Sequence, residues 1–595
     1  MARDLTVVIH DFDGSEESAA CARALAAVET TGTRKLAVVE RSGADAARKL
    51  LAPLGFEVVA VPNGSSPGRR KNAGCEASGG DVLLISGAAE PAGDDWLDSL
   101  RGEAEASGAG VAGLKVVGGT GEVVNAGYHV LQPECELLGL GEGRKDVNQY
   151  YYAREVEGVG STCMLLTRQA IEEVGGFDAD YSDGYDDVDF CLKAKAAGLP
   201  VICAGSARVV LRGSADRTGD EGSRAAYRER WADHYRDRYD TRVMWHSWIN
   251  APSGYAVSSQ YIVLALEALG VDVRYGYVYG VEEPPNADER IMEVRRKPKD
   301  LDATQVVYGQ GDVFFKNSGS YKVGYSMLEV TGIPPDWVAQ ANALDEVWVP
   351  SHFNQDTFSS SGVTRPIHVM PLGVDVDYFH PFIERRGPGR FVFSSVFEWG
   401  DRKAPEALLT AYNREFSAAD DVLLLLKVNN NDPAVNIERH IQAMGLAPDR
   451  APVTIVLNQS VPSYQMGMFY RSSDCFVLPT RGEGWGMPTL EAMACGLPVI
   501  STAWSAQTEF FNDEVGYPIK VKGLVPATAR GAYYEGFQWA DPDVDHLAAL
   551  MRQVYQNPAE ARAKGLAASV AAREKWTWTA AAERIKKRLG EISSR

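Results

Sequence analysis

Closely spaced cysteines, which define several classes of metal site and disulfide framework, are missing from this sequence. The eight cysteines include no Cys-x-x-Cys pair, and most of them lie in apolar stretches, such as Cys203 in VICAG. A cysteine-based metal site or a disulfide scaffold is therefore not expected. We interpret the cysteines as reduced thiols buried in the core of a cytosolic protein.

Long hydrophobic runs are also missing. No stretch approaches the roughly 18 consecutive apolar residues that a membrane-spanning helix needs. The N-terminal MARDLTVVIHDFDG has one short apolar run followed by acidic residues, which is the pattern of a buried strand and not of a secretory signal. We expect a cytoplasmic protein, with any membrane contact limited to peripheral binding at the inner face.

Positive charge is not in excess. The chain has 60 lysines and arginines against 80 aspartates and glutamates, and its formal net charge is −20 at pH 7. This balance gives no support for wrapping a polyanion, so nucleic acid is not an expected partner. Hydrophobic residues at 45% and charged residues at 24% are ordinary for a globular protein, which excludes disordered and fibrous classes.

The chain is long enough for about three or four compact units. From Asp4 to Gly213, short apolar runs such as LTVVI and DVLLIS alternate with helical stretches, which predicts a parallel sheet covered by helices. The Arg-rich stretch from Ser214 to Arg242 carries nearly as many acidic residues. We interpret it as a solvated connecting helix, with a binding patch as the alternative. A second α/β alternation begins at Arg242 and is long enough for two similar lobes.

A glycine-rich turn follows one strand of this second alternation. Strand DCFVLPT leads into Arg481-Gly-Glu-Gly-Trp-Gly and then into the helical run PTLEAMACG. Free backbone N–H groups at such a helix start can face an anionic or hydroxyl-rich ligand, and glycines allow close approach. Glu483 can accept hydrogen bonds from sugar hydroxyls, and Glu491, about two turns into the helix, can reach another part of the same ligand.

With these two carboxylates and the segment PTLEAMACGLPVI, residues 242–590 resemble the retaining glycosyltransferases of family 4. The resemblance implies the two-lobed GT-B fold, with the donor in the cleft between the lobes. It also implies that Glu483 contacts the donor sugar and Glu491 binds the ribose. Backbone groups of the turn would serve the sugar as well, at Gly484, Trp485 and Gly486.

Other positions of this half extend the expected donor site. In VFEWGDRKAPEALLTAY, Arg402 and Lys403 resemble the basic pair that neutralises the donor diphosphate without a metal cofactor, although a solvated helix start is the alternative. Gly254, in NAPSGYAVSS, resembles the first-lobe loop beside the diphosphate. Lys427 and Asn429 end a strand, where open α/β sheets bind ligands, and are further donor-binding candidates.

The first half carries a different set of landmarks. LTVVIHDFDG, KLAVVERSGADAA and VPNGSSPGRRKNAGCEASGGDVLLISG resemble, in order, the inverting glycosyltransferases of family 2, whose fold is GT-A. The resemblance assigns Glu40 to the nucleotide base, with a capping or loop role as the alternative. The segment ending in GYDDVDFCLKAKAAG makes Asp187 the candidate general base, with a helix N-cap as the alternative.

One landmark of that family is absent. Where an Asp-x-Asp metal motif is expected, the chain reads Leu84-Ile-Ser-Gly-Ala-Ala-Glu90, so two ligating carboxylates are missing and Glu90 is a candidate substitute. No metal-binding residues are therefore assigned, and a divalent metal cofactor is doubtful for this half. Either arginines neutralise the diphosphate instead, at Arg69, Arg70 or Arg212, or the domain no longer transfers sugar.

The sequence thus predicts an α/β chain, with a GT-A-like domain at 1–213, a helical linker at 214–241, and GT-B lobes at 242–378 and 379–595. The last helix is expected to return to the first lobe. The expected function is transfer of a sugar from a UDP- or GDP-linked donor to a glycan, lipid-linked or protein acceptor, in surface polysaccharide or glycoconjugate synthesis. The alternatives are a first half that only binds the acceptor, acts as a scaffold or is a second, metal-independent transferase, and a whole chain that only binds nucleotide sugar or glycan.

Overall fold

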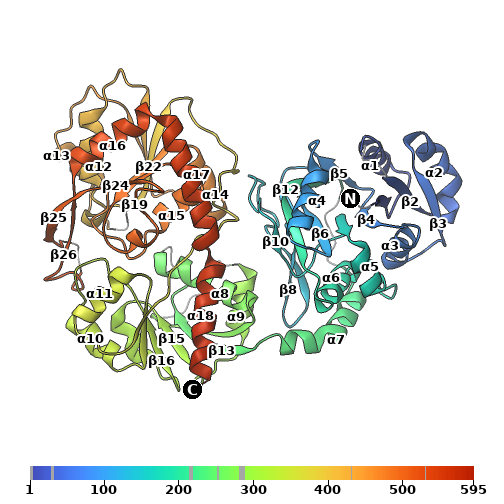
Figure 1. Cartoon of the computed structure of the whole chain (residues 1–595), viewed down its shortest axis with the longest axis horizontal. Helices are drawn as coiled ribbons and strands as arrows, with labels where there is room; N and C mark the ends of the chain where they lie inside the picture. Colours follow the sequence, from blue (N-terminus) through green and yellow to red (C-terminus); the bar gives the residue numbers. More distant parts are fainter. Residues whose placement is uncertain are drawn as a thin grey trace. The chain divides into compact units, whose positions relative to one another are not determined.

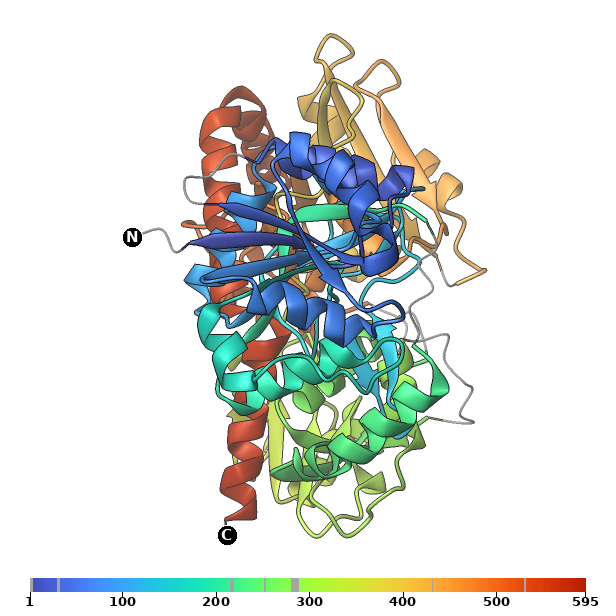
Figure 2. The same ribbon diagram turned by 90° about the vertical axis from the view of Figure 1, so that its right-hand side faces the viewer.

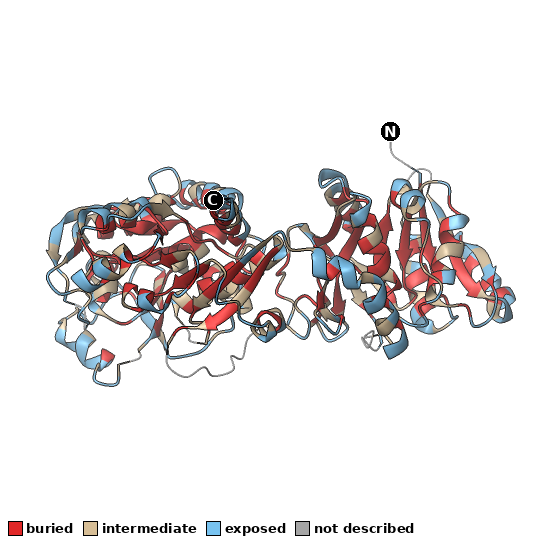
Figure 3. Cartoon of the chain, turned by 90° about the horizontal axis from the view of Figure 1, so that it is seen from below, coloured by how far each residue is buried: buried red, intermediate tan, exposed pale blue. Residues whose placement is uncertain are grey.

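The computed structural model describes residues 4–28, 33–213, 219–250, 253–279, 288–430, 432–528 and 531–594. The chain forms two compact units, Met1–Asp237 and Arg238–Arg595 (Figure 1). In each unit the sheet strands are mostly buried, and the exposed residues lie on the outer helices and loops (Figure 3). None of the helices in the described ranges combines the length and apolarity needed to cross a bilayer.

The first unit is built on a ten-stranded mixed sheet. Its parallel half has the order β3-β2-β1-β4, with strands β1 (Leu5–Ile9), β2 (Arg34–Glu40), β3 (Glu57–Val61) and β4 (Asp81–Ile85). The other half contains β5 (Ala89–Ala92), β6 (Val111–Gly118), β7 (Val123–Asn125), β10 (Arg154–Glu155), β11 (Cys163–Leu166) and β12 (Val201–Leu211). A separate hairpin pairs β8 (Tyr128–Leu131) with β9 (Glu136–Gly139).

The expectation of a parallel sheet in this unit is only partly correct, because β5, β7, β10 and β11 run antiparallel to their neighbours. Strand β11 runs antiparallel to both β4 and β6. Between β6 and β11 the chain makes short strands and hairpins and no crossover helix, and a parallel return would need such a crossover. The helices of the unit are α1 (Glu16–Ala26), α2 (Ala44–Leu51), α3 (Pro67–Glu76), α4 (Trp96–Ala106), α5 (Arg168–Val174) and α6 (Asp186–Ala196).

Helix α7 (Glu221–Asp237) corrects the expected linker at 214–241. Tyr227 and Tyr235 are buried in one cluster with Tyr181 and Tyr185. The hydroxyl groups of Tyr227 and Tyr235 are 2.9 Å apart. Trp231 Nε1 donates to Asp189 at 2.9 Å. Residues four apart share one helix face, so these aromatic side chains form an apolar stripe that the surrounding charges obscure in the sequence. The helix belongs to the first unit, whereas residues 214–218 lie outside the described residues.

The second unit contains two six-stranded sheets, and every neighbouring pair of strands in each sheet is parallel. The first lobe has the order β14-β13-β15-β16-β17-β18, with β13 (Thr241–Ser247), β14 (Val271–Tyr277), β15 (Gln305–Tyr308), β16 (Lys322–Tyr325), β17 (Glu346–Val349) and β18 (Ile367–Val369). Its helices are α8 (Gly254–Ala268), α9 (Glu289–Arg296), α10 (Pro335–Asn342) and α11 (His352–Ser360). The expected α/β class is confirmed.

The second lobe has the order β21-β20-β19-β22-β23-β24, with β19 (Phe391–Glu398), β20 (Val422–Asn429), β21 (Val453–Leu457), β22 (Cys475–Leu478), β23 (Val499–Thr502) and β24 (Tyr517–Ile519). Its helices are α12 (Pro405–Glu415), α13 (Ile437–Ala443), α14 (Ser463–Arg471), α15 (Met487–Ala494), α16 (Val544–Gln556) and α17 (Pro558–Lys575). An antiparallel hairpin of β25 (Val521–Pro526) and β26 (Gln538–Pro542) follows β24.

Helix α18 (Trp578–Ser593) connects the two lobes. Helix α17 packs on α15 and α16 of the second lobe, whereas α18 packs on α8 and β13 of the first (Figures 1 and 2). The rings of Trp578 and Tyr261 are stacked with centroids 5.3 Å apart. Arg588 donates from Nη2 to Glu346 Oε2 at 2.5 Å, inside the first lobe.

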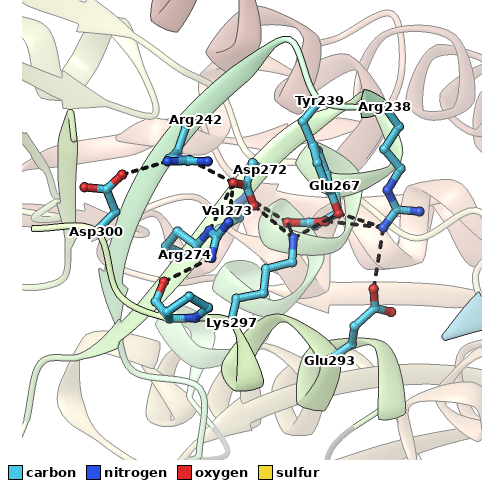
Figure 4. A network of polar contacts seen from close by, with 11 residues as sticks. Arg238, Tyr239, Arg242, Glu267, Asp272, Val273, Arg274, Glu293, Lys297 and Asp300 are labelled. Carbon is cyan, nitrogen blue, oxygen red and sulfur yellow. Dashed lines mark hydrogen bonds and ion pairs between the residues drawn. The ribbon is translucent and has the colours of Figure 1, made fainter. Parts of the chain in front are cut away.

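A charged network fixes the beginning of the second unit (Figure 4). The carboxylate of Asp272 accepts hydrogen bonds from Arg242 at 2.8 Å, Arg274 at 2.7 Å and Lys297 at 3.2 Å. Burial raises the pKa of Asp272, but the Arg274 hydrogen bond and the charge of Lys297 outweigh it, so the net pKa is lowered. Because acidic and basic groups balance in this network, we interpret it as structural.

Candidate functional site

The glycine-rich turn lies between the end of strand β22 and the start of helix α15. Gly486 is the N-cap residue of α15 and has φ of +97°, a conformation that side-chain-bearing residues rarely adopt. Glu483 is only 5% exposed, and its backbone N–H donates to Ser505 Oγ at 2.8 Å. The turn therefore holds a buried carboxylate beside the N-terminus of a helix.

Two cations meet this carboxylate from a different part of the second lobe. Lys403 Nζ lies 2.5 Å from Glu483 Oε1, and Arg402 Nη1 lies 3.4 Å from Glu483 Oε2 and 2.8 Å from the carbonyl oxygen of Gly482. Both cations belong to the short 3₁₀ turn Asp401–Lys403 that follows strand β19. Three of the predicted site residues therefore converge in one cluster.

The electrostatics of this cluster favour the charged forms of Glu483 and Arg402 and disfavour that of Lys403. Burial raises the pKa of Glu483, but the charges of Lys403 and Arg402 outweigh this effect and lower it overall. Burial and the neighbouring Arg402 lower the pKa of Lys403. The two cations that pair with this buried carboxylate are the groups that an anionic ligand can bind.

Glu491 lies on α15, the helix that Gly486 caps. Its Oε2 accepts a hydrogen bond from the Tyr470 hydroxyl at 2.6 Å. Burial raises the pKa of Glu491 to about 7, with the Tyr470 hydrogen bond opposing the rise and the charge of Asp375 adding to it. Glu491 thus changes its protonation state near neutral pH.

The first lobe approaches this helix start through Gly254. Gly254 is the first residue of α8, and Ser253 caps the helix by accepting a hydrogen bond from the N–H of Ala256 at 3.2 Å. A Cβ atom added at Gly254 would lie 3.9 Å from the terminal methyl of Met487, the first residue of α15. The N-termini of two helices, one from each lobe, are therefore neighbours at the candidate site. Residues 251–252 of the expected loop lie outside the described residues.

The remaining candidates of this half lie in different surroundings. Gly484 packs closely against Met327, and the indole of Trp485 is 3% exposed between Phe510 and Trp576, so Trp485 can serve a ligand only through its backbone. Lys427 is buried near the end of β20, and burial lowers its pKa. Asn429 is exposed at the end of the strand. Among the described residues, no hydrogen bond or ion pair joins Lys427 or Asn429 to Glu483 or its two cations.

Two residues of the cluster gave no signal in the sequence. Glu329, which follows strand β16 in the first lobe, lies with Oε1 2.9 Å from Arg402 Nε. The Tyr534 hydroxyl, from the segment between β25 and β26, donates to the same Oε1 at 2.7 Å. Neither residue belongs to a glycine-rich turn or a strand-end motif, and only the packing of the lobes brings them to Arg402.

In the first unit, Asp187 lies in a pocket of about 230 Å³ together with Lys71, Arg70 and Asp186. Lys71 Nζ donates to Asp186 Oδ2 at 2.8 Å and also contacts Asp187 Oδ1. The N–H of Ser161 donates to Asp187 Oδ2 at 2.7 Å. The alternative reading of Asp187 as an N-cap is wrong, because Tyr185 occupies that position and Asp187 lies within the first turn of α6.

The buried lysine sets the charge of this acidic pair. Burial raises the pKa of both carboxyl groups, and Lys71 opposes it. The outcome is a lowered pKa for Asp187 and a pKa of about 7 for Asp186. An Asp187 carboxylate that is already paired with a cation is a weak proton acceptor.

Other predicted positions of the first unit make local contacts. Glu40 Oε1 accepts from the N–H of Gly64 at 2.9 Å, which is the contact of a loop-ordering residue. Ser86 Oγ donates to Asp11 Oδ2 at 2.9 Å, at the position of the missing metal motif. Glu90 forms an ion pair with Arg212 at 2.6 Å. Within the described ranges, no three His, Cys, Asp or Glu side chains gather closely enough to hold a metal ion.

Comparison with known proteins finds a similarity to glycosyltransferases in the second lobe. Residues 388–557 match the family of glycosyl transferases group 1, and this segment contains the cations and carboxylates of the site at Arg402, Lys403, Glu483 and Glu491. This segment also carries the glycine-rich turn and helix α15.

Individual relatives cover parts of the chain. The GDP-mannose-dependent alpha-(1-6)-phosphatidylinositol monomannoside mannosyltransferase of Mycolicibacterium smegmatis is 26% identical over 281 residues, which are 44% of this chain and 66% of that protein. The O-antigen biosynthesis protein RfbC of Myxococcus xanthus is 30% identical over 157 residues, 26% of this chain and 12% of that protein. The chain thus spans less than two thirds of both curated relatives. Sucrose-phosphate synthase from Thermosynechococcus elongatus aligns in structure over 60% of this chain and 99% of its own, with 17% identity and a TM-score of 0.45.

Proposed function

We propose that the second unit, residues 238–595, is a hexosyltransferase that moves a sugar from a nucleotide-sugar donor to a hydroxyl group of an acceptor. The observation that carries the proposal is the convergence of Arg402 and Lys403 on Glu483, in the glycine-rich turn at the start of α15. The match of the surrounding segment to group 1 glycosyl transferases supports it.

Each group of the cluster has a role in binding this donor. Arg402 and Lys403 neutralise the diphosphate, and the N-terminus of α8 at Gly254 adds backbone N–H groups to the same anion. Glu483 and the backbone at Gly486 bind hydroxyl groups of the sugar. Glu491 binds the ribose, and Lys427 and Asn429, at the carboxyl edge of the sheet, extend the donor site.

The proposed reaction breaks the bond between the anomeric carbon and the diphosphate oxygen and forms a bond between that carbon and the acceptor oxygen. Charge develops on the leaving diphosphate, where fixed cations stabilise the transition state more than the ground state. The acceptor oxygen attacks the anomeric carbon on the face from which the diphosphate departs and passes its proton to the leaving phosphate, so the configuration is retained. Arg402 and Lys403 supply this stabilisation without a divalent cation.

The relatives indicate the class of donor and pathway that we propose. A GDP-mannose-dependent mannosyltransferase and an O-antigen biosynthesis protein are among them. We therefore propose a GDP- or UDP-linked hexose as donor, and a glycan or lipid-linked acceptor in surface-glycan synthesis. Such acceptors are available at the inner face of a membrane.

The test measures the release of nucleotide from a panel of nucleotide sugars, with and without EDTA, on the full-length protein. We expect Glu483→Gln and Lys403→Ala each to lower turnover by about a hundredfold, because Lys403 stabilises the charge on the leaving diphosphate and Glu483 holds the sugar and the two cations. The matched control is Glu438→Gln, which changes an exposed carboxylate of the same lobe. Full activity in both site variants would refute the assignment.

For the first unit we propose a GT-A-like module that binds a glycan or acceptor without transferring sugar. The supporting observation is the pairing of Asp187 with Lys71, together with Ser86 at the place of a metal-binding carboxylate. We expect Asp187→Asn to leave the turnover number of the full chain unchanged and to raise the KM for a glycan acceptor. A second transfer product that disappears in Asp187→Asn would instead establish a second transferase.

A further inference from the structure

Glu329 is the contribution of the first lobe to the Arg402 cluster. Its Oε1 lies 2.9 Å from Arg402 Nε and accepts a hydrogen bond from the Tyr534 hydroxyl at 2.7 Å. A Cβ atom added at Gly484 would lie 3.5 Å from Glu329 Oε2. The carboxylate therefore lies against the glycine-rich turn of the other lobe, beside the cation that the proposed function assigns to the donor diphosphate.

The position of Glu329 is fixed by its surroundings. The residue is 8% exposed. Its carbonyl oxygen lies 2.4 Å from the position that a Cβ of Gly482 would take, so the two backbones are in close contact. The preceding residue is held as well, because Asn354 Nδ2 donates to the carbonyl oxygen of Leu328 at 2.8 Å. A side chain with so little room cannot swing away from Arg402 without moving the backbone.

These contacts orient the guanidinium of Arg402. Its Nε forms an ion pair with Glu329, and its Nη1 donates hydrogen bonds to Glu483 and to the Gly482 carbonyl. Among the described residues, Nη2 has no hydrogen-bond partner. Because the guanidinium is planar, fixing two of its nitrogens fixes the direction of the third. Nη2 is thus held ready for an anionic oxygen.

The hairpin of β25 and β26 connects this arrangement to the packing of the lobes. Trp539, on β26, is buried in the core cluster of the first lobe. The N–H of Thr331 donates to the Gln538 carbonyl at 3.0 Å, so the hairpin also makes a backbone contact with the first lobe. The neighbouring Tyr533 hydroxyl donates to Asp312 at 2.8 Å, away from the cluster.

From this geometry we infer that Glu329 is a positioning residue for donor binding, held in place by Tyr534, and that it acts by orienting Arg402 toward the donor diphosphate. The inference rests on the proposed function of the second unit. It also gives the hairpin a role. Tyr534 of the second lobe holds the carboxylate of Glu329, which comes from the first lobe and pairs with Arg402 of the second. A competing role, in which Glu329 leaves Arg402 when the donor arrives, conflicts with its burial and its pinned backbone.

The experiment measures binding of UDP and of GDP to the full-length protein by calorimetry, together with KM and kcat for the donor. We expect Glu329→Ala to weaken nucleotide binding about tenfold or more, because a buried ion pair is lost and Arg402 is freed. Glu329→Gln is expected to restore most of the affinity, since the amide oxygen can take the place of Oε1 beside Arg402 and can still accept the hydrogen bond from Tyr534. The effect should appear in kcat as well as in KM, because Arg402 also stabilises the charge that develops on the leaving diphosphate.

Two neighbouring tyrosines provide a matched pair. Tyr534→Phe removes the hydroxyl that holds Glu329, whereas Tyr533→Phe removes one that contacts Asp312 instead. We expect weaker binding of UDP or GDP in Tyr534→Phe and wild-type binding in Tyr533→Phe. Equal affinities in both variants would refute the role of Tyr534.

The outcomes separate this inference from the function on which it rests. If the wild type binds neither UDP nor GDP, the proposed function fails. If the wild type binds one of them and Glu329→Ala binds it equally well, the positioning role alone fails. Tighter binding in Glu329→Gln than in the wild type would show that the carboxylate competes with the donor, and would also overturn the positioning role.

Discussion

Glu491 is a site residue of the second unit whose charge depends on pH near neutrality, because burial raises its pKa to about 7. A ribose hydroxyl donates more strongly to a carboxylate than to a carboxylic acid. We therefore expect the affinity for the nucleotide to rise as the pH increases from about 6 to about 8, where the carboxylate becomes the main form. Calorimetric titrations across this range should lose the pH dependence in Glu491→Gln, and an unchanged dependence in that variant would assign it to another group.

The same residue makes a prediction for stability. Because the pKa of Glu491 is about 7 in the folded chain and about 4.3 in an unfolded one, the folded state is penalised as the pH rises between these values, and fully above about 7. Glu491→Gln should therefore stabilise the protein at pH 8 and not at pH 4. The side chain is only half-buried, so solvent screening limits the expected gain to about 1–2 kcal/mol. Thermal unfolding at both pH values checks this.

In the first unit, the buried charged residue with the largest expected effect on stability is Lys71, which lies between Asp186 and Asp187. Lys71→Met should destabilise the unit by about 3–5 kcal/mol, because two buried carboxyl groups lose their cation. Hydrogen exchange measured by mass spectrometry on α3 and α6 would report the loss of protection. Adding Asp186→Asn and Asp187→Asn to Lys71→Met should restore much of that protection. Without such a recovery, the effect would be one of packing and not of charge.

Helix α18 is attached to the first lobe by its apolar face, by contacts of Lys586 with Asp240 and Leu269, and by a buried ion pair of Arg588. Arg588 pairs with Glu346, which also accepts hydrogen bonds from Trp348 at 2.7 Å and Tyr321 at 2.9 Å. Arg588→Ala leaves this carboxylate without its cation, and we expect a loss of about 3–5 kcal/mol. The helix should then be cut by a protease at lower protease concentrations.

The control for this prediction lies one turn earlier on the same helix. Arg584 is exposed, and Arg584→Ala makes the same chemical change without touching Glu346. We expect wild-type protease resistance in Arg584→Ala. Equal sensitivity of the two variants would show that helix propensity, and not the ion pair, holds α18 in place.

For the whole molecule, the position of the boundary between the two units decides which N-terminal fragment can fold by itself. A fragment of residues 1–237 keeps α7 and its buried tyrosines, whereas a fragment of residues 1–213 leaves Tyr181 and Tyr185 uncovered. We expect the longer fragment to unfold cooperatively and the shorter one to bind a hydrophobic dye and aggregate. Circular dichroism melts with dye fluorescence test this, and cooperative melting of residues 1–213 would restore α7 to the role of a linker.

The candidate site was predictable where its residues belong to one lobe and to local patterns. Glu483 and Gly486 lie in a strand-to-helix turn, and Arg402 and Lys403 come directly before a helix, so spacing and residue type indicate a ligand site at both positions. The partners Glu329, Tyr534 and Lys71 carry no such pattern. Each is placed by contacts between segments far apart in the chain, which periodicity and turn chemistry do not encode.

By itself, the sequence determined the α/β alternation, the glycine that opens α15 and the kinds of charged group in the second lobe. These depend on local periodicity, on the backbone freedom of Gly486 and on side-chain chemistry, all of which neighbouring residues specify. Only the tertiary structure decided that α7 closes the first unit, that Lys71 neutralises Asp187 and that Glu329 reaches Arg402. The physical reason is that burial and the pairing of distant charges arise when whole layers pack together.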